Sequence, residues 1–125
     1  MVDSHVERAL AAMKREPSRG WTVAALARVA GLSRAPFARR FERALGVPPR
    51  RYLTELRLRR AATRLVTTDA RLAEIATEVG YATEFSFAKA FKRAFGVAPG
   101  LFRKRAWAGT RHIGSFTVTS AARAA

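Results

Sequence analysis

The pattern of apolar positions along the chain occurs twice. The segments VAALARVAGLSRAPFARRFERALGVPP, from residue 23, and LAEIATEVGYATEFSFAKAFKRAFGVAP, from residue 72, share one order of features. Each has a short apolar stretch, a glycine, and a second stretch with phenylalanine at i and i+4. Apolar residues three and four apart share one helical face, and a glycine suits a left-handed turn, so each copy predicts a helix-turn-helix. Corresponding residues are Leu26 and Ile75, Gly31 and Gly80, Phe37 and Phe87, Phe41 and Phe91, and Gly46 and Gly96.

Capping residues mark where most of the expected helices begin. Thr22, Ser33 and Thr83 each stand directly before a stretch with helical apolar spacing, where an N-cap is expected. No segment before residue 107 alternates as a strand would. The sequence therefore predicts an all-α fold of seven helices. One ends before Pro17, five lie near residues 22–30, 34–45, 49–67, 72–79 and 84–95, and a short one follows Pro99.

The first and fifth helices are expected to have other N-cap residues. Ser4 and Glu7 have the Ser-x-x-Glu spacing of a capping box, which predicts a cap at Ser4 for the first helix. Before the fifth helix Arg71 stands where a serine or threonine is expected, and Asp69 is the substitute cap that we expect there.

A long helix is expected between the two copies. Residues 49–67 would span about 27 Å at 1.5 Å per residue. The expected architecture is two three-helix subdomains joined by this linker helix, within a domain of residues 5–105. The first helix-turn-helix covers about 22–45 and the second about 71–95. Residues 106–125, rich in Ala, Gly, Ser and Thr, predict a disordered tail, in which 116–119 could alternate as a strand.

Charge indicates the kind of partner. The 125 residues include 24 Lys and Arg against 9 Asp and Glu, for a net charge of +15, so a polyanion is expected. The 49% apolar content still allows a core. Between residues 33 and 64 there are ten arginines and two acids. Such a run can be a solvated face, but its place along a turn-capped helix and the linker favours a surface that follows phosphates.

The sequence gives little support for catalysis, metal binding or a membrane location. There is no Cys, which excludes thiolate catalysis and thiolate metal sites, and His5 and His112 stand without a carboxylate at ligand or relay spacing. The 125 residues contain no glycine-rich phosphate loop, no N-terminal apolar stretch that resembles a signal peptide, and no apolar run long enough for a membrane span. We therefore expect no catalytic residue, no metal, no cofactor, no membrane partner and a cytoplasmic location.

Three motifs carry a family resemblance: WTVAALARVAGLSRAPFARRF, PPRRYLTELRLRRAATRL and IATEVGYATEFSFAKAFKRAFGVAPGLFR. Together they resemble the C-terminal DNA-binding domain of the AraC/XylS transcriptional regulators over about residues 5–105. The resemblance implies two recognition helices in successive major-groove segments of double-stranded DNA. It implies base contacts from Ala35, Ala38 and Arg39, and from Glu84, Phe85, Ser86 and Lys89. It implies phosphate or supporting contacts from Arg34, Arg40, Thr83 and Lys92.

Further candidates come from the helix positions themselves. Ser33 and Ala88 lie at or on the recognition helices, and Arg57 and Arg60 on the linker are expected to contact phosphate. Ala35 and Ala38 are too short to hydrogen-bond a base. We therefore expect Arg39 to make the main base contacts of the first recognition helix.

Two residues of the second recognition helix each allow two interpretations. Glu84 could accept a hydrogen bond from cytosine or complement the helix dipole. Phe85 could contact a thymine methyl or be partly buried against a neighbouring helix.

We expect a sequence-specific transcriptional regulator that binds an asymmetric site of about 20 base pairs as a monomer, with RNA polymerase as a further partner. The alternatives are a non-specific architectural DNA-binding protein, a DNA-repair enzyme that uses this module, a DNA-binding or inactive fragment of a larger effector-sensing regulator, and an RNA-binding protein. Most members of the family carry an N-terminal effector-binding or dimerisation domain; we expect none within these 125 residues, so the resemblance implies neither ligand control nor dimerisation.

Overall fold

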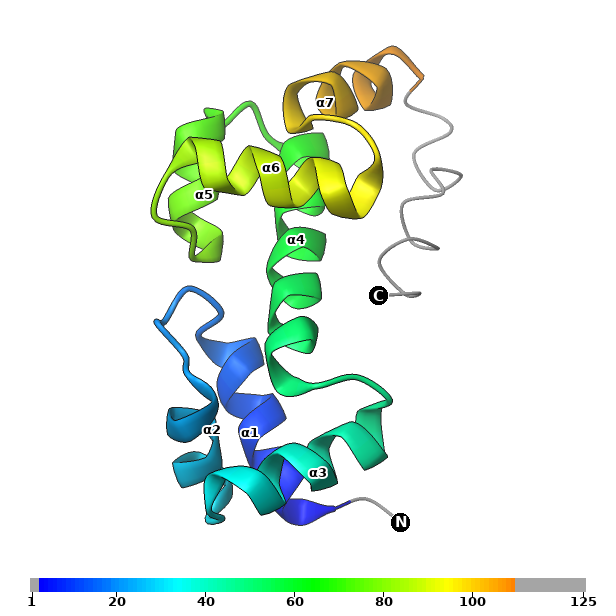
Figure 1. Ribbon diagram of the computed structural model, residues 1–125. Coiled ribbons are helices and arrows are strands. Elements are labelled where there is room, and N and C mark those ends of the chain that lie inside the picture. The colour runs from blue at the N-terminus through cyan, green and yellow to red at the C-terminus, as the bar shows by residue number, and fades with distance from the viewer. Residues whose placement is uncertain (1–2, 110–125) are drawn as a thin grey trace. The chain divides into compact units, whose positions relative to one another are not determined.

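The computed structural model describes residues 3–109, in which seven α-helices and no strand occur. The all-α, seven-helix, double helix-turn-helix architecture predicted from the sequence is confirmed. The chain divides into two compact units, of which the first ends at Leu56 and the second begins at Arg57. In chain order the helices are α1 (Ser4–Arg15), α2 (Val23–Ala30), α3 (Arg34–Leu45), α4 (Pro49–Thr67), α5 (Leu72–Val79), α6 (Glu84–Phe95) and α7 (Pro99–Ala108) (Figure 1).

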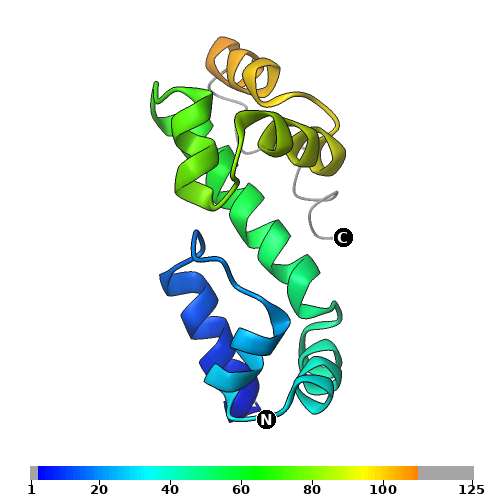
Figure 2. The ribbon, with the colours of Figure 1, turned by 60° about the vertical axis from the view of Figure 1, so that its left-hand side comes forward.

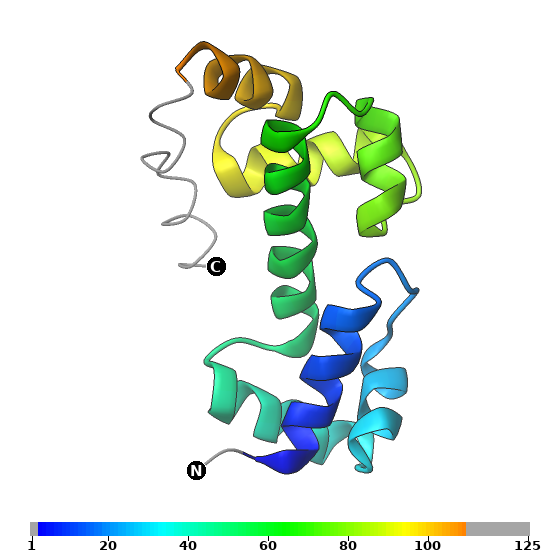
Figure 3. The same ribbon diagram turned by 180° about the vertical axis from the view of Figure 1, so that it is seen from behind.

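The first unit is a small bundle of α1, α2 and α3. Helix α1 contacts both α2 and α3, and Figure 3 shows α1 crossing α3 with α2 beside it. The first turns of α4 complete the unit, because Leu53 and Leu56 enter the same core. The other buried members are Val6, Ala9, Met13, Leu26, Ala27, Ala30, Phe37 and Phe41.

The second unit has its own core. Helix α6 packs against both α5 and α7, as Figure 2 shows from another side. The later turns of α4 supply Leu58, Ala61 and Leu65 to this core. Phe91 lies at its centre, with its ring centroid 4.4 Å from that of Phe95 and 5.2 Å from that of Phe102. The remaining buried members are Ile75, Ala76, Val79 and Phe87.

The repeat in the sequence is a repeat in local geometry. Gly31 and Gly80 adopt left-handed φ values of +78° and +105° at the ends of α2 and α5. The next residue then donates its backbone N–H to a carbonyl five positions earlier, over 3.0 Å in the first copy and 2.8 Å in the second. This 6→1 bond is that of a Schellman motif, which ends the helix and redirects the chain. The turn glycines therefore do what the sequence predicted.

Two helix starts differ from the prediction. Asp3, not Ser4, is the N-cap of α1, because its carboxylate accepts the backbone N–H groups of His5 and Val6. At α5 the N-cap is Arg71 itself, and Asp69 does not take that place. There the side chain of Glu74 accepts the Arg71 backbone N–H at 3.2 Å, which is half of a capping box.

All three predicted N-cap residues of the helix-turn-helix units occupy the N-cap position, and two of them make a capping hydrogen bond. Thr22 and Thr83 accept the backbone N–H groups of Ala25 and Ser86, both at 3.0 Å. Ser33 occupies the N-cap position of α3 in extended backbone, but its side chain makes no capping hydrogen bond.

The predicted tail begins too early, because α7 continues to Ala108. Ala106 is fully buried, and the Trp107 indole donates to the Val66 carbonyl at 3.0 Å, which holds the last turn against α4. The possible strand at 116–119, His112 and the rest of the predicted tail from residue 110 lie outside the described residues.

Candidate nucleic-acid interface

Helix α3 presents a short, basic outer face. Phe37 and Phe41 are fully buried on its inner side, with ring centroids 5.7 Å apart, and they anchor the helix in the first core. On the other side Arg39 is exposed and Ala38 is half-buried. The small side chains beside the guanidinium leave room for a close approach to base edges. Exposed at the start of the helix are Ser33, Arg34 and Ala35.

Arg40 is committed to a partner within the protein. Its Nε donates to Asp3 Oδ2 at 2.8 Å, and this bond joins α3 to the cap of α1. Partial desolvation of Asp3 raises the pKa of its carboxyl, but hydrogen bonds from Arg40 and from the Val6 and His5 backbone outweigh this and lower the pKa. Arg40 therefore supports the orientation of α3, and a phosphate contact would have to share its guanidinium.

Helix α6 has the same construction with different outer side chains. Phe87 and Phe91 are fully buried, with ring centroids 5.8 Å apart, and occupy the positions of Phe37 and Phe41 in the first copy. Thr83 caps the helix, and its hydroxyl also donates to that of Ser86 at 2.9 Å. The predicted outer residues are exposed except for half-buried Ala88: Thr83, Glu84, Phe85, Ser86, Lys89 and Lys92.

The structure excludes one of the two interpretations that the sequence left open for Phe85. The Phe85 side chain is 73% exposed, so partial burial against a neighbouring helix is wrong. Lys89 lies beside it on the next turn, with Nζ 5.3 Å from the ring centroid. Glu84 is exposed in the first turn of α6, where a carboxylate complements the helix dipole.

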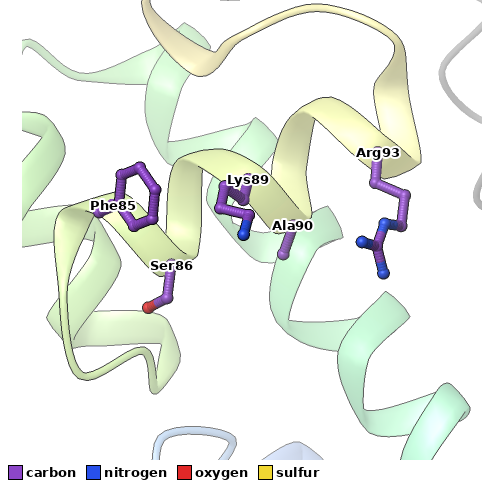
Figure 4. Close-up of a pocket in the computed structure, with 5 residues that line it drawn as sticks. All are labelled: Phe85, Ser86, Lys89, Ala90 and Arg93. Atoms are coloured by element: carbon purple, nitrogen blue, oxygen red, sulfur yellow. The ribbon is translucent and has the colours of Figure 1, made fainter.

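Two residues extend this face beyond the prediction. A shallow hollow of about 260 Å³ runs along α6, and its lining includes Ala90 and the exposed Arg93 (Figure 4). The sequence could have indicated Arg93, because it follows Lys89 by four residues and therefore shares its helical face. The other lining residues, Phe85, Ser86 and Lys89, were predicted.

The arginines of α4 divide by their surroundings. Arg60 is exposed, as a phosphate contact requires, whereas Arg57 is half-buried near Tyr81. Burial lowers the pKa of Arg57 and raises the pKa of the Tyr81 phenol, and the interaction between the two groups opposes both shifts. Arginine nevertheless stays charged at neutral pH. Arg64 is paired with Glu78 of α5.

Within residues 3–109 no cluster of three or more His, Asp or Glu side chains could hold a metal ion. In the same range, no helix combines the length and apolarity needed to span a membrane. Helices α3 and α6 each present outer side chains that are cationic, hydrogen-bonding or apolar. These groups are suited to reading the edges and phosphates of a nucleic-acid groove.

Known proteins share this arrangement. A family of helix-turn-helix domains matches residues 26–105. A Streptomyces lividans protein described as an AraC-like transcription regulator is 44% identical over 104 residues, covering 83% of this chain and 34% of that protein. The HTH-type transcriptional activator RclR of Escherichia coli K12 is 45% identical over 93 residues, covering 74% and 33%. The DNA-binding domain of AdpA, a global transcriptional factor crystallised with a target DNA, superposes with a TM-score of 0.81 at 27% identity, over 84% of this chain and 95% of that domain.

Two turn-capped outer helices, each anchored by a buried phenylalanine pair, define a double helix-turn-helix protein. The chain belongs to the AraC/XylS family of helix-turn-helix transcriptional regulators. It spans about a third of the length of the curated relatives that it matches.

Proposed function

We propose that this chain is the sequence-specific DNA-binding module of a transcriptional regulator, and that α3 and α6 enter successive major-groove segments of one double-stranded site. The duplicated recognition helix carries the proposal. In both copies a fully buried phenylalanine pair anchors a helix whose opposite face is exposed and bears a cation, Arg39 in α3 and Lys89 in α6. The similarity to a domain crystallised with its target DNA supports it.

The two readers have different chemistry in this proposal. In α3, Arg39 bonds a guanine through two donors, while Ala35 and Ala38 permit close approach and contact methyl groups. In α6, Glu84, Phe85, Ser86 and Lys89 face the bases, with Ala88 beside them. Phosphates are held by Arg34, Arg57, Arg60 and Lys92, while Ser33, Arg40 and Thr83 support the helices.

The DNA-binding domain in this proposal covers residues 5–105, with helix-turn-helix units at 22–45 and 71–95 joined by the 49–67 helix. Because the two recognition helices differ, the preferred site is asymmetric. It spans about 20 base pairs and is bound by one chain without a dimer partner. The regulator acts in the cytoplasm, contacts RNA polymerase, and performs no catalysis.

Selection of bound duplexes from a random pool tests the proposal directly. We expect an enriched asymmetric motif with two conserved segments about ten base pairs apart, centre to centre. Recovery of duplexes without any shared motif would contradict it and would favour the non-specific architectural role, which the net charge of +15 could also support.

A further inference from the structure

Phe85 is an apolar side chain in an unusual place. It is 73% exposed, while Val29, Leu101 and Trp107, the other exposed large apolar side chains among residues 3–109, range from 38% to 46%. It is the second residue of α6, on the outer face between polar neighbours. Packing gives no reason for it, because the buried anchors of this helix are Phe87 and Phe91.

The Phe85 ring lies beside a cation and lines the hollow along α6. The Lys89 ammonium lies over the ring, 5.3 Å from its centroid, a cation–π arrangement that covers one face. Phe85 and Ala90 supply apolar lining to the hollow along α6, and Ser86, Lys89 and Arg93 supply polar and cationic lining (Figure 4). The hollow thus combines a small apolar surface with groups that attract a polyanion.

A major groove offers one apolar group at its base edges, the 5-methyl of thymine. Phenylalanine contacts this methyl well, and burying it between an aromatic ring and an alanine methyl is favourable. Guanine, adenine and cytosine have no methyl group there, and the ring cannot satisfy the donors and acceptors that they present.

We propose that Phe85 is the specificity-determining residue for one thymine in the part of the site read by α6, and that it recognises this base by its 5-methyl group. Lys89 keeps the ring in place from one side, so the free face and edge of the ring receive the methyl. This inference rests on the proposed function, because it assumes that α6 enters the major groove.

Replacing thymine by deoxyuridine tests the inference, because the two bases differ only by this methyl. Each thymine of the selected site is replaced in turn, and dissociation constants are measured by fluorescence anisotropy for the wild type and for Phe85→Ala. We expect one thymine whose replacement weakens wild-type binding about fourfold, the value of one buried methyl, and leaves Phe85→Ala binding unchanged. At that position cytosine should bind weakly, and 5-methylcytosine should recover about fourfold in the wild type alone.

Leu101→Ala is the matched control, because it removes another exposed apolar side chain from outside the site. It should show the same response to deoxyuridine as the wild type. If every replacement affects wild type and Phe85→Ala equally while both still prefer the selected site, the inference is overturned and the proposed function stands. If no site is preferred over random duplex, the proposed function itself fails.

Discussion

Arg64 of α4 and Glu78 of α5 form two parallel hydrogen bonds, from Nε to Oε1 and from Nη2 to Oε2, each 2.7 Å long. The hydrogen bond from Arg64 lowers the pKa of Glu78 below its ordinary value of 4.5, against a smaller opposing effect of burial. The pair ties the last turn of α5 to the linker helix within the second unit.

This pair should make stability depend on pH. Because the folded pKa of Glu78 is depressed, its contribution is complete above about pH 4.5 and is lost as the pH falls through the lower folded pKa. Glu78→Gln should therefore unfold more easily than the wild type at pH 7, and the difference should shrink below pH 4.5. Denaturant unfolding followed by circular dichroism measures this. Glu42→Gln, at an exposed carboxylate of α3, is the control, and a Glu78→Gln effect that is constant with pH would contradict the account.

Phe85 and Phe87 are two residues apart and should respond in opposite ways to truncation. Phe87 is fully buried, so Phe87→Ala should cost about 3–5 kcal/mol in the free energy of unfolding. Phe85→Ala should change that free energy by less than about 0.5 kcal/mol, because the side chain is exposed, and should weaken specific DNA binding. Thermal unfolding and binding titrations on the two variants separate the roles. Comparable destabilisation by both would show that Phe85 is a core residue.

Much of the fold followed from the repeat, because glycine turns and phenylalanine pairs act through local spacing. The left-handed Gly31 and Gly80 and the two buried pairs were predictable for that reason. Contacts between distant segments were not. The bond from Arg40 to Asp3 spans 37 positions, and its formation depends on how α1 lies against α3.

The candidate site shows the same division. Helical periodicity separated the buried anchors from the outer residues of α3 and α6. It left the exposure of Phe85 open, because that depends on which neighbouring helix comes near. Arg93 was not predicted, although its spacing of four residues from Lys89 places it on the same face.

Arg39 should control sequence preference. Arg39→Ala should cost about 1–3 kcal/mol on the preferred site and relax selection at one base pair, since two guanine contacts are lost. Arg60→Ala is the matched comparison and should weaken all duplexes alike, because a phosphate contact carries no sequence information. Repeating the random-duplex selection with each variant measures both effects. An unchanged motif with Arg39→Ala would show that this residue does not read a base.

Binding should depend strongly on salt. If about six to ten phosphates are neutralised, the slope of log K against log salt concentration should lie near −5 to −9. Titrations of the selected duplex at several salt concentrations give this slope. A slope shallower than about −2 would be incompatible with an interface over two groove segments.

Both recognition helices of one chain are proposed to read one site together, and α4 offers the place to test this. Leu53 and Leu56 belong to the first core, and Leu58, Ala61 and Leu65 to the second. One alanine inserted between Leu56 and Arg57 therefore leaves both sets of contacts within their own units. It turns the second unit by about 100° and moves it by about 1.5 Å along the helix axis.

The decisive measurement is the affinity of this insertion variant for the full selected site, beside its circular dichroism and its affinity for random duplex. We predict wild-type helicity, unchanged weak binding to random duplex, and a specific affinity reduced to nearly that level, because the two helices can no longer enter one face of the DNA together. Wild-type affinity for the full site, with helicity intact, would contradict the account and show that a single helix-turn-helix contacts DNA or that the linker bends freely.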